Sequence, residues 1–404
     1  MLADYTPTGN DEIDNYYKQL ENENNNKTLS RNSTCVRQKS VVSINSNPES
    51  SSFSRYKKVP MVALDNDIES DYMNLVVQGL ANIKSIILYY LQNIDLFRDK
   101  VEDIPLSYAF SRIIFHLWPY PQDSLDKSYS LSSFQKIVTY LNPIFNVSSS
   151  KNPVDFIIFL LDALHNEDKM INNNNNDEMK EETYKKMREY LKYLIDNENS
   201  IALKTFCWIS QKVKHCSGCN TQSIIYQKFF TFDLNLEGYS NEAAFQEKNE
   251  IHILDLINFY KKQKKIYNIY CPACQQKTNF DLDSTIIIYP EVFVLLIRLP
   301  DKCKDKSVKT INYKVIIDEN IDLIDFNDKK EKYDLLGLIV KDYVKTKDNK
   351  EKTNYIAYYN SPVDKQFYFY KGKEIKNCNK KFYIDINKYE MYPTVLFYQK
   401  RKDS

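Results

Sequence analysis

The chain has 404 residues, 43% of them apolar, so it can bury a sizeable core in one large domain or two. Its formal net charge of +1 gives no indication of a polyanion-binding surface, and six glycines argue against phosphate-binding glycine loops. No apolar run approaches the roughly 18 residues of a membrane span. The first residues lack the charged and apolar segments of a signal sequence, and eight cysteines fit a reducing compartment better than a disulfide framework.

The N-terminal part is polar and rich in Asn, Ser and Glu. We expect a disordered or weakly ordered tail over 1–70, order from near Tyr72, and a folded domain over 71–404. Apolar residues at helical spacing predict a buried helix over 82–97 and further helices over about 105–118 and 131–141. Asn152 and Pro153 are typical of a helix start, and 178–195 reads as an amphipathic helix.

After about Ala202 the apolar period changes from helix to strand. Apolar residues alternate over 224–236, with Lys228 as the exception, and predict one strand. A short helix is expected over 253–260, and the apolar run 286–299 predicts a central strand entered near Pro290. Further strands are expected over 333–341, 355–360, 366–371 and 394–399. Helices first and strands later indicate an α+β fold.

Two C-x-x-C pairs stand out, Cys216 with Cys219 and Cys271 with Cys274. Each pair is a turn that aims two thiolates at one point, and two such turns complete a tetrahedral Cys₄ shell for Zn²⁺. Four unrelated buried thiols or a redox pair are the alternatives. The intervening 51 residues, 220–270, exceed the roughly 15–20 of a compact zinc ribbon, so we expect the pairs on separate hairpins. A closed four-thiolate site predicts a structural zinc.

The chain resembles the ubiquitin-specific protease (USP) family in several quoted segments. Cys216-Ser217-Gly218-Cys219 leads into 229–236 (Phe-Phe-Thr-Phe-Asp-Leu-Asn-Leu), like the family's first zinc pair and its following strand. Residues 270–274, 289–299 and 393–400 resemble the second pair, the next strand and the closing strand. The resemblance covers roughly 75–400. It implies a papain-like fold with a helical thumb, zinc-bearing β fingers and a β-rich palm.

A closer resemblance is to the family's splicing-associated branch. Residues 79–84 (Gly-Leu-Ala-Asn-Ile-Lys) carry Asn-Ile-Lys where active members have their cysteine motif, and 117–119, 154–156 and 161–165 are similar to the branch too. The resemblance implies a catalytically silent scaffold associated with the spliceosomal tri-snRNP. The chain is two residues shorter than the family pattern between Asn82 and Gln92. Residues 1–75 hold one cysteine and no histidine, so the branch's N-terminal ubiquitin-binding zinc finger is not expected there.

A thiol protease needs a thiolate, a histidine and a group that orients the histidine. Counting back from Gln92 places Ser85 at the family's cysteine position, and counting forward from Gly79 places Ile87 there. In the resemblance, Asn354 stands at the histidine position and Lys371 at the orienting acid. Thiol and base are both absent, so we expect no catalytic residue. A serine mechanism on Ser85 is disfavoured because Asn354 cannot accept a proton.

The other reactive residue types have ordinary interpretations. His116 and His165 are expected to be core histidines, while His215 adjoins Cys216 and is an alternative metal ligand. Cys207, Cys303 and Cys378 are expected to be small apolar residues, and Cys35 lies in the tail. The run 261–265 (Lys-Lys-Gln-Lys-Lys) is typical of a solvated helix end, with contact to RNA or an acidic protein as the alternative.

We therefore expect an inactive USP-like scaffold in pre-mRNA splicing, located in the nucleus, with tri-snRNP proteins as partners. The alternatives are an active cysteine-type deubiquitinase and a ubiquitin-binding pseudo-protease in another pathway such as RNA decay. Whether ubiquitin is a partner stays open. Direct binding to nucleic acid or to membranes is not expected.

Overall fold

The computed structural model describes residues 59–65, 71–118, 128–146, 152–172, 187–240, 250–262, 264–298, 314–324, 329–345, 351–378 and 391–402. Most of the predicted tail, 1–58 and 66–70, lies outside these residues. Residues 59–65 belong to the fold: β1 (Ala63–Asp65) pairs in parallel with β2 (Ser128–Ser130), and Val62 and Leu64 are buried. Order therefore begins before the predicted Tyr72, because a short strand pairs with a distant segment.

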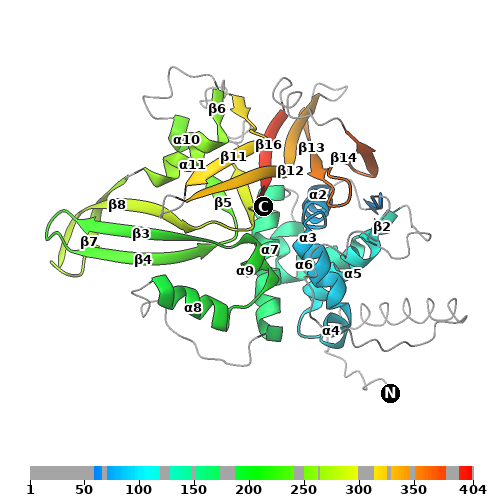
Figure 1. Ribbon diagram of the computed structural model, residues 1–404, viewed down its shortest axis with the longest axis horizontal. Coiled ribbons are helices and arrows are strands. Elements are labelled where there is room, and N and C mark those ends of the chain that lie inside the picture. Colours follow the sequence, from blue (N-terminus) through cyan, green and yellow to red (C-terminus); the bar gives the residue numbers. More distant parts are fainter. Residues whose placement is uncertain are drawn as a thin grey trace, which may run out of the picture. The chain divides into compact units, whose positions relative to one another are not determined.

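Helices come first in the chain and form the part coloured blue to green in Figure 1. They are α2 (Asp71–Leu80), α3 (Lys84–Gln92), α4 (Ile94–Asp99), α5 (Pro105–Leu117), α6 (Ser132–Leu141), the 3-10 helix η3 (Pro143–Asn146), α7 (Pro153–Asn172), α8 (Met187–Asn197) and α9 (Ile201–Phe206). Helix α5 packs on α3, α4, α6 and α7, and α7 also packs on α2 and α9. The helices over 105–118 and 131–141 are confirmed. Of the helix predicted over 178–195, residues 178–186 lie outside the described part.

Two local features explain the helix boundaries. The predicted start at Asn152 is confirmed, because its Oδ1 accepts a hydrogen bond from the Asp155 amide at 2.8 Å. The single helix predicted over 82–97 is wrong, since it breaks between α3 and α4 at Asn93. The side-chain and backbone amides of Asn93 both donate to Tyr89 O, at 2.8 and 3.1 Å, which marks the end of α3.

The larger sheet has eight strands in the order β15-β14-β13-β12-β16-β9-β5, with β11 also paired to β12. These are β5 (Phe232–Leu234), β9 (Val292–Ile297), β11 (Asn320–Ile324), β12 (Lys330–Lys345), β13 (Glu351–Asn360), β14 (Phe367–Lys371), β15 (Glu374–Asn377) and β16 (Met391–Lys400). Every residue of β9 is buried, as its continuous apolar sequence predicts. Helix α2 packs on β12, β13 and β14. Helix α7 contacts β16, and helix α9 contacts β9. Sheet and helices thus form the palm and thumb of the predicted fold.

A second sheet has four strands in the order β4-β3-β8-β7, all antiparallel. They are β3 (Trp208–Cys216), β4 (Gln222–Phe229), β7 (Lys264–Cys271) and β8 (Gln276–Ile288), and Figure 1 shows them as long neighbouring ribbons, the fingers. Nearby lie α10 (Leu236–Ser240), α11 (Ile253–Lys261) and the parallel pair β6 (Glu250–His252) and β10 (Lys314–Ile316). No helix in the described part of the chain is long and apolar enough to cross a membrane.

Two predicted strands each divide between the two sheets. The strand predicted over 224–236 bends at Phe230 and Thr231, so β4 lies in the fingers and β5 in the palm. The strand predicted over 286–299 likewise divides into the end of β8 and β9, with Tyr289 and Pro290 between them. The second apolar run continues through its bend because Ile286, Ile287 and Val292 are buried on either side of it, whereas in β4 only Tyr226 is buried. Apolar periodicity alone does not show where a strand changes sheets.

Candidate functional site

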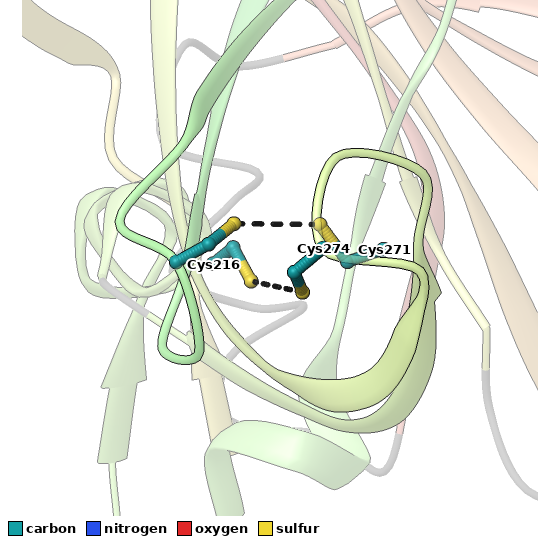
Figure 2. A group of neighbouring side chains, drawn as sticks. Cys216, Cys271 and Cys274 are labelled. Carbon is teal, nitrogen blue, oxygen red and sulfur yellow. Dashed lines mark hydrogen bonds between the residues drawn. The ribbon is translucent and has the colours of Figure 1, made fainter.

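Four cysteines meet at the tip of the fingers. Cys216 and Cys219 lie at the turn from β3 to β4, and Cys271 and Cys274 lie at the turn from β7 to β8, so the predicted separate hairpins are confirmed. Figure 2 shows the side chains facing one another across the two turns. All four sulfur atoms lie within 4.8 Å of one another.

The sulfur–sulfur distances fit a metal ion. Cys216 Sγ is 4.0 Å from Cys274 Sγ, and Cys219 Sγ is 3.8 Å from Cys271 Sγ. A tetrahedron of metal–sulfur bonds of about 2.3 Å, as for zinc, has sulfur–sulfur edges of about 3.8 Å. A disulfide would need about 2.05 Å, so the redox-pair alternative does not describe this arrangement. The donor set can hold one four-coordinate ion with no open position.

Local backbone conformation explains why the two turns converge. Asn220 follows the first pair with φ 55° and Gln275 follows the second with φ 54°, so each turn ends in the left-handed region. Gly218 does not have a positive φ; a Cβ there would lie 3.2 Å from Thr278 Oγ1, so its small size permits close packing. The Thr221 hydroxyl, 3.1 Å from Cys219 Sγ, lowers the pKa of that thiol to about 6. This favours the thiolate at Cys219, whereas burial raises the pKa of Cys274 to about 12, so a metal would have to displace the proton of that thiol.

The position expected for a protease nucleophile lies at the start of α3. Ser85 is half-buried, and its hydroxyl lies 3.3 Å from Thr205 Oγ1 of α9. Ile87, the other candidate position, is fully buried in the core. Asn354 is half-buried on β13 opposite Asp342 of β12, and Lys371 is exposed at the end of β14. Within the described residues, no hydrogen bond joins any two of Ser85, Asn354 and Lys371.

The segments that carry these positions nevertheless meet. Asn82, just before α3, donates to Gln78 O at 2.8 Å and lies 3.4 Å from the hydroxyl of Tyr370, the residue before Lys371. Tyr359 of β13 donates to Leu75 O of α2 at 2.6 Å, and a Cβ on Gly79 would lie 2.9 Å from its ring. The helix start and strands β13 and β14 are thus in contact. Ser85 and Lys371 lie close in sequence to these contacting residues, whereas no hydrogen bond in the described part of the chain brings Asn354 to them.

The chain has four histidines, all of them described, and each is engaged elsewhere. His116 stacks on Tyr129, and His252 lies 3.1 Å from Asp318. His215 lies 3.5 Å from Asp283, opposite in direction to its neighbour Cys216, so it is not a metal ligand. His165 is buried on α7, as predicted. No imidazole therefore contacts Ser85.

His165 belongs to a buried polar cluster that sequence reasoning missed. Its Nδ1 lies 2.6 Å from Ser200 Oγ, and its Nε2 lies 3.1 Å from Glu198 Oε2 and 2.9 Å from Lys228 Nζ. Lys228 also forms an ion pair with Glu198. Burial first, and then the positive charges of Lys228 and Lys169, lower the pKa of His165 to about 3. The one available signal was Lys228, the polar exception in an apolar strand.

This cluster resembles a Ser-His-acid triad in distances, but it is closed to a substrate. Nε2 of His165 faces both the Glu198 carboxylate and the Lys228 ammonium. Ser200 Oγ accepts from the Leu203 amide at 2.9 Å, as the cap of α9. Ser200 is 1% exposed, so its hydroxyl is engaged in the helix cap and out of reach of a substrate. The cluster joins α7, α9 and β4 and is not a nucleophilic site.

The described thiols outside the cysteine cluster are not activated either. Burial raises the pKa of Cys207 to about 12 and that of Cys378 to about 11. Both thiols are protonated at neutral pH, which agrees with their prediction as small apolar residues. Cys35 and Cys303 lie outside the described residues.

Comparison with known proteins identifies the fold. Ubiquitin carboxyl-terminal hydrolase 4 of Vanderwaltozyma polyspora is 23% identical over 281 residues, 64% of this chain and 31% of the relative. Ubiquitin carboxyl-terminal hydrolase 2 of Bos taurus is 21% identical over 321 residues, 75% of this chain and 50% of the relative. The chain thus spans half or less of the length of these curated relatives.

Solved structures show the same architecture. The yeast SAGA deubiquitinating module and the SAGA Ubp8/Sgf11/Sus1/Sgf73 DUB module bound to ubiquitin aldehyde match with TM-scores of 0.60 and 0.61. Both share 14% identity with this chain and cover 86% of it and 70% of the matched chain. At that identity the match establishes the fold alone. The family model described as ubiquitin carboxyl-terminal hydrolase matches residues 62–398, and the chain therefore belongs to the ubiquitin carboxyl-terminal hydrolase family.

Proposed function

We propose that this chain is a catalytically inactive member of its family that acts as a protein scaffold in pre-mRNA splicing, associated with the tri-snRNP in the nucleus. Hydrolysis of a ubiquitin conjugate by a cysteine mechanism needs a thiolate and a base that hold and move a proton. By the resemblance, the catalytic positions of this chain hold Ser85, Asn354 and Lys371, none of which is a thiol or an imidazole.

The observation that carries the proposal is the position of the histidines. All four have partners away from α3, so no imidazole is available to Ser85. Asn354 has neither acid nor base chemistry at neutral pH, and a serine needs a base partner even more than a cysteine does. The thiol of Cys207, two residues beyond the Thr205 that contacts Ser85, is buried and protonated.

The splicing part of the proposal rests on the resemblance of four short segments to one branch of the family. Two of them contact each other: Trp118 Nε1 donates to Ala81 O at 2.7 Å, which joins segment 117–119 to segment 79–84. A third segment contains His165, the centre of the buried cluster. The residues that carry the resemblance thus contribute to the packing of the thumb.

We further propose that the cysteine cluster binds one structural Zn²⁺. Four thiolates and no open position suit zinc, which would tie the two finger hairpins together. Metal analysis of the purified protein should find one zinc per chain, and a folded protein without metal would refute this assignment.

Hydrolysis is tested with a fluorogenic ubiquitin amide and with diubiquitin, using a ubiquitin vinyl probe to trap any reactive cysteine. We expect no turnover and no labelled cysteine. Activity that co-purifies with the chain and is lost when one of its residues is changed would establish the active deubiquitinase instead.

The pathway is tested by affinity purification of the tagged chain from its own cells, followed by mass spectrometry. Tri-snRNP proteins are the expected partners. Recovery of deadenylase subunits, or of ubiquitin chains alone, would overturn the splicing assignment while leaving the absence of catalysis intact.

A further inference from the structure

The finger sheet segregates charge between its two faces. Along β8, Phe280, Leu282 and Ser284 lie on one face, and Asp281 and Asp283 lie on the other, because side chains alternate along a strand. The first face also receives Lys212 and Lys214 from β3 and Lys264 from β7. We call this the lysine face. Its strand residues in the described part of the sheet include three lysines and no carboxylate.

Register places the lysines in a defined pattern. Lys214 pairs with Leu282, and Leu282 pairs with Lys264, so two ammonium groups flank one leucine across three strands. Strands β3 and β7 are separated by β8, so their backbones lie about 10 Å apart. Lys212 is two residues from Lys214 on the same face. Ile225 of β4, opposite Lys212, is 38% exposed and extends the apolar part of the surface.

The three ammonium groups are close enough to repel one another. Partial burial and the charges of Lys214 and Lys264 lower the pKa of Lys212. Among described residues, none of the three forms an ion pair, whereas the opposite face pairs His215 with Asp283. A surface of this size ordinarily mixes both signs of charge. The net charge of +1 gives no sign of the lysine face, because acidic residues elsewhere in the chain balance its positive charge.

The aromatic rings near the lysine face do not offer a stacking surface for bases. Lys264 Nζ lies 5.4 Å from the ring centre of Phe259 and 5.9 Å from that of Tyr260, and Lys212 Nζ lies 5.8 Å from that of Phe229. Phe280 is buried against the cysteine cluster. Proteins that bind single-stranded nucleic acid combine positive charge with open aromatic rings. Here the lysines lie over these rings. Of the exposed tyrosines of β7, Tyr270 lies on the opposite face and Tyr267 lies at the irregularity after Ile266.

We propose that the lysine face binds an acidic segment of a partner protein in which carboxylates flank an aliphatic side chain. Lys214 and Lys264 flank Leu282, so a segment with a carboxylate on each side of an aliphatic residue offers the complementary charges with an apolar group between them. The carboxylates relieve the repulsion among the lysines, and the aliphatic side chain covers Leu282 and Ile225. The inference stands independently of the splicing assignment and of zinc identity.

The test uses fluorescence anisotropy with a labelled peptide of three Asp-Leu-Glu-Ser repeats. We expect saturable binding to the full chain that weakens as salt rises. The double variant Lys212→Glu with Lys264→Glu should weaken binding at least about tenfold. The control is Lys265→Glu with Lys277→Glu, on β7 and β8 of the same sheet, with the same change in charge but on the opposite face; it should change affinity less than about threefold.

Metal content and the thermal unfolding midpoint of both double variants are measured alongside, so that unfolding of the fingers is recognised. A twelve-residue oligouridylate is the second probe. Peptide binding that is lost equally in both double variants, or absent in the wild-type chain, overturns the proposal. Tighter binding of the oligouridylate than of the peptide overturns it too, and assigns the face to nucleic acid.

Discussion

The fingers and the thumb are held together in different ways. At the finger tip, four thiols from two short motifs converge on one point. In the thumb, buried polar side chains of α7 reach the ends of other helices. Glu167 accepts hydrogen bonds from the amides of Leu106 and Ser107 at 3.0 and 2.6 Å, at the start of α5. Asp168 accepts from the Ile201 amide at 3.0 Å, at the start of α9. In the fingers four thiols converge, whereas in the thumb helix caps are supplied from outside each helix.

The difference shows which stabilising interactions can be recognised from the sequence alone. A C-x-x-C pair can be recognised in the sequence because both cysteines belong to one turn. A cap supplied by another helix has no local signature, since the acceptor lies 33 to 61 residues from the amide it binds. Carboxylates favour the positive end of a helix dipole whichever segment supplies them.

The largest effect is expected at the finger tip. Cys271→Ala removes one ligand and should abolish stoichiometric zinc binding and lower the thermal unfolding midpoint by more than about 5 °C. The matched control is Cys378→Ala, a protonated thiol outside the cluster, which should keep full zinc content. Zinc is measured by mass spectrometry and unfolding by calorimetry. Equal behaviour of the two variants would show that the cluster does not tie the fingers.

The same contrast explains how far the sequence predicts this molecule. The α+β class, most helices and the metal-ligand set follow from apolar period and cysteine spacing, which are local. The division of β8 from β9 at Pro290 does not, because the end of β8 and all of β9 form one continuous apolar run. The cluster of His165, Ser200 and Lys228 joins residues up to 63 positions apart, so only Lys228 gave a local sign of it.

The next effect is expected in the thumb, at the cap of α5. Glu167→Ala leaves the amides of Leu106 and Ser107 without their acceptor in a buried setting, and should cost about 2 kcal/mol of unfolding free energy. Urea denaturation measures it. Glu189→Ala, an exposed glutamate of α8, serves as the control and should stay within about 0.5 kcal/mol of wild type. A Glu167 variant as stable as the control would mean that the cap contributes nothing.

A smaller effect concerns pH and His165. The pKa of His165 is about 3 in the folded chain and about 6.5 when unfolded. Between pH 3 and pH 6.5 the unfolded state therefore binds a proton that the folded state does not bind. The free energy of unfolding is not reduced by this histidine above pH 6.5, and it decreases as the pH falls below that value. From pH 7 to 5 the loss is about 2 kcal/mol. Asp168 opposes it, because burial raises its folded pKa to about 6 and protonation then favours the folded state.

His165→Asn separates the two contributions. The variant keeps Asp168, so the difference between variant and wild type isolates the histidine. Unfolding free energies at pH 7 and pH 5 should show wild type losing about 2 kcal/mol more than His165→Asn. Parallel pH profiles would contradict a neutral, buried imidazole beside Lys228.

The smallest effect is expected at Ser85. Ser85→Ala removes the 3.3 Å contact with Thr205, and one such hydroxyl pair should contribute less than about 1 kcal/mol to the free energy of unfolding.

If the chain acts as a scaffold, this variant should restore splicing in depleted cells as well as wild type does. Cys271→Ala should fail in the same assay, because the two finger hairpins would lose one of the four cysteines that link them. Intron retention, measured on endogenous transcripts, separates the outcomes. A Ser85→Ala protein that folds normally yet fails to restore splicing would show that the serine still performs chemistry. The thumb would then hold an active site that its residue types do not reveal.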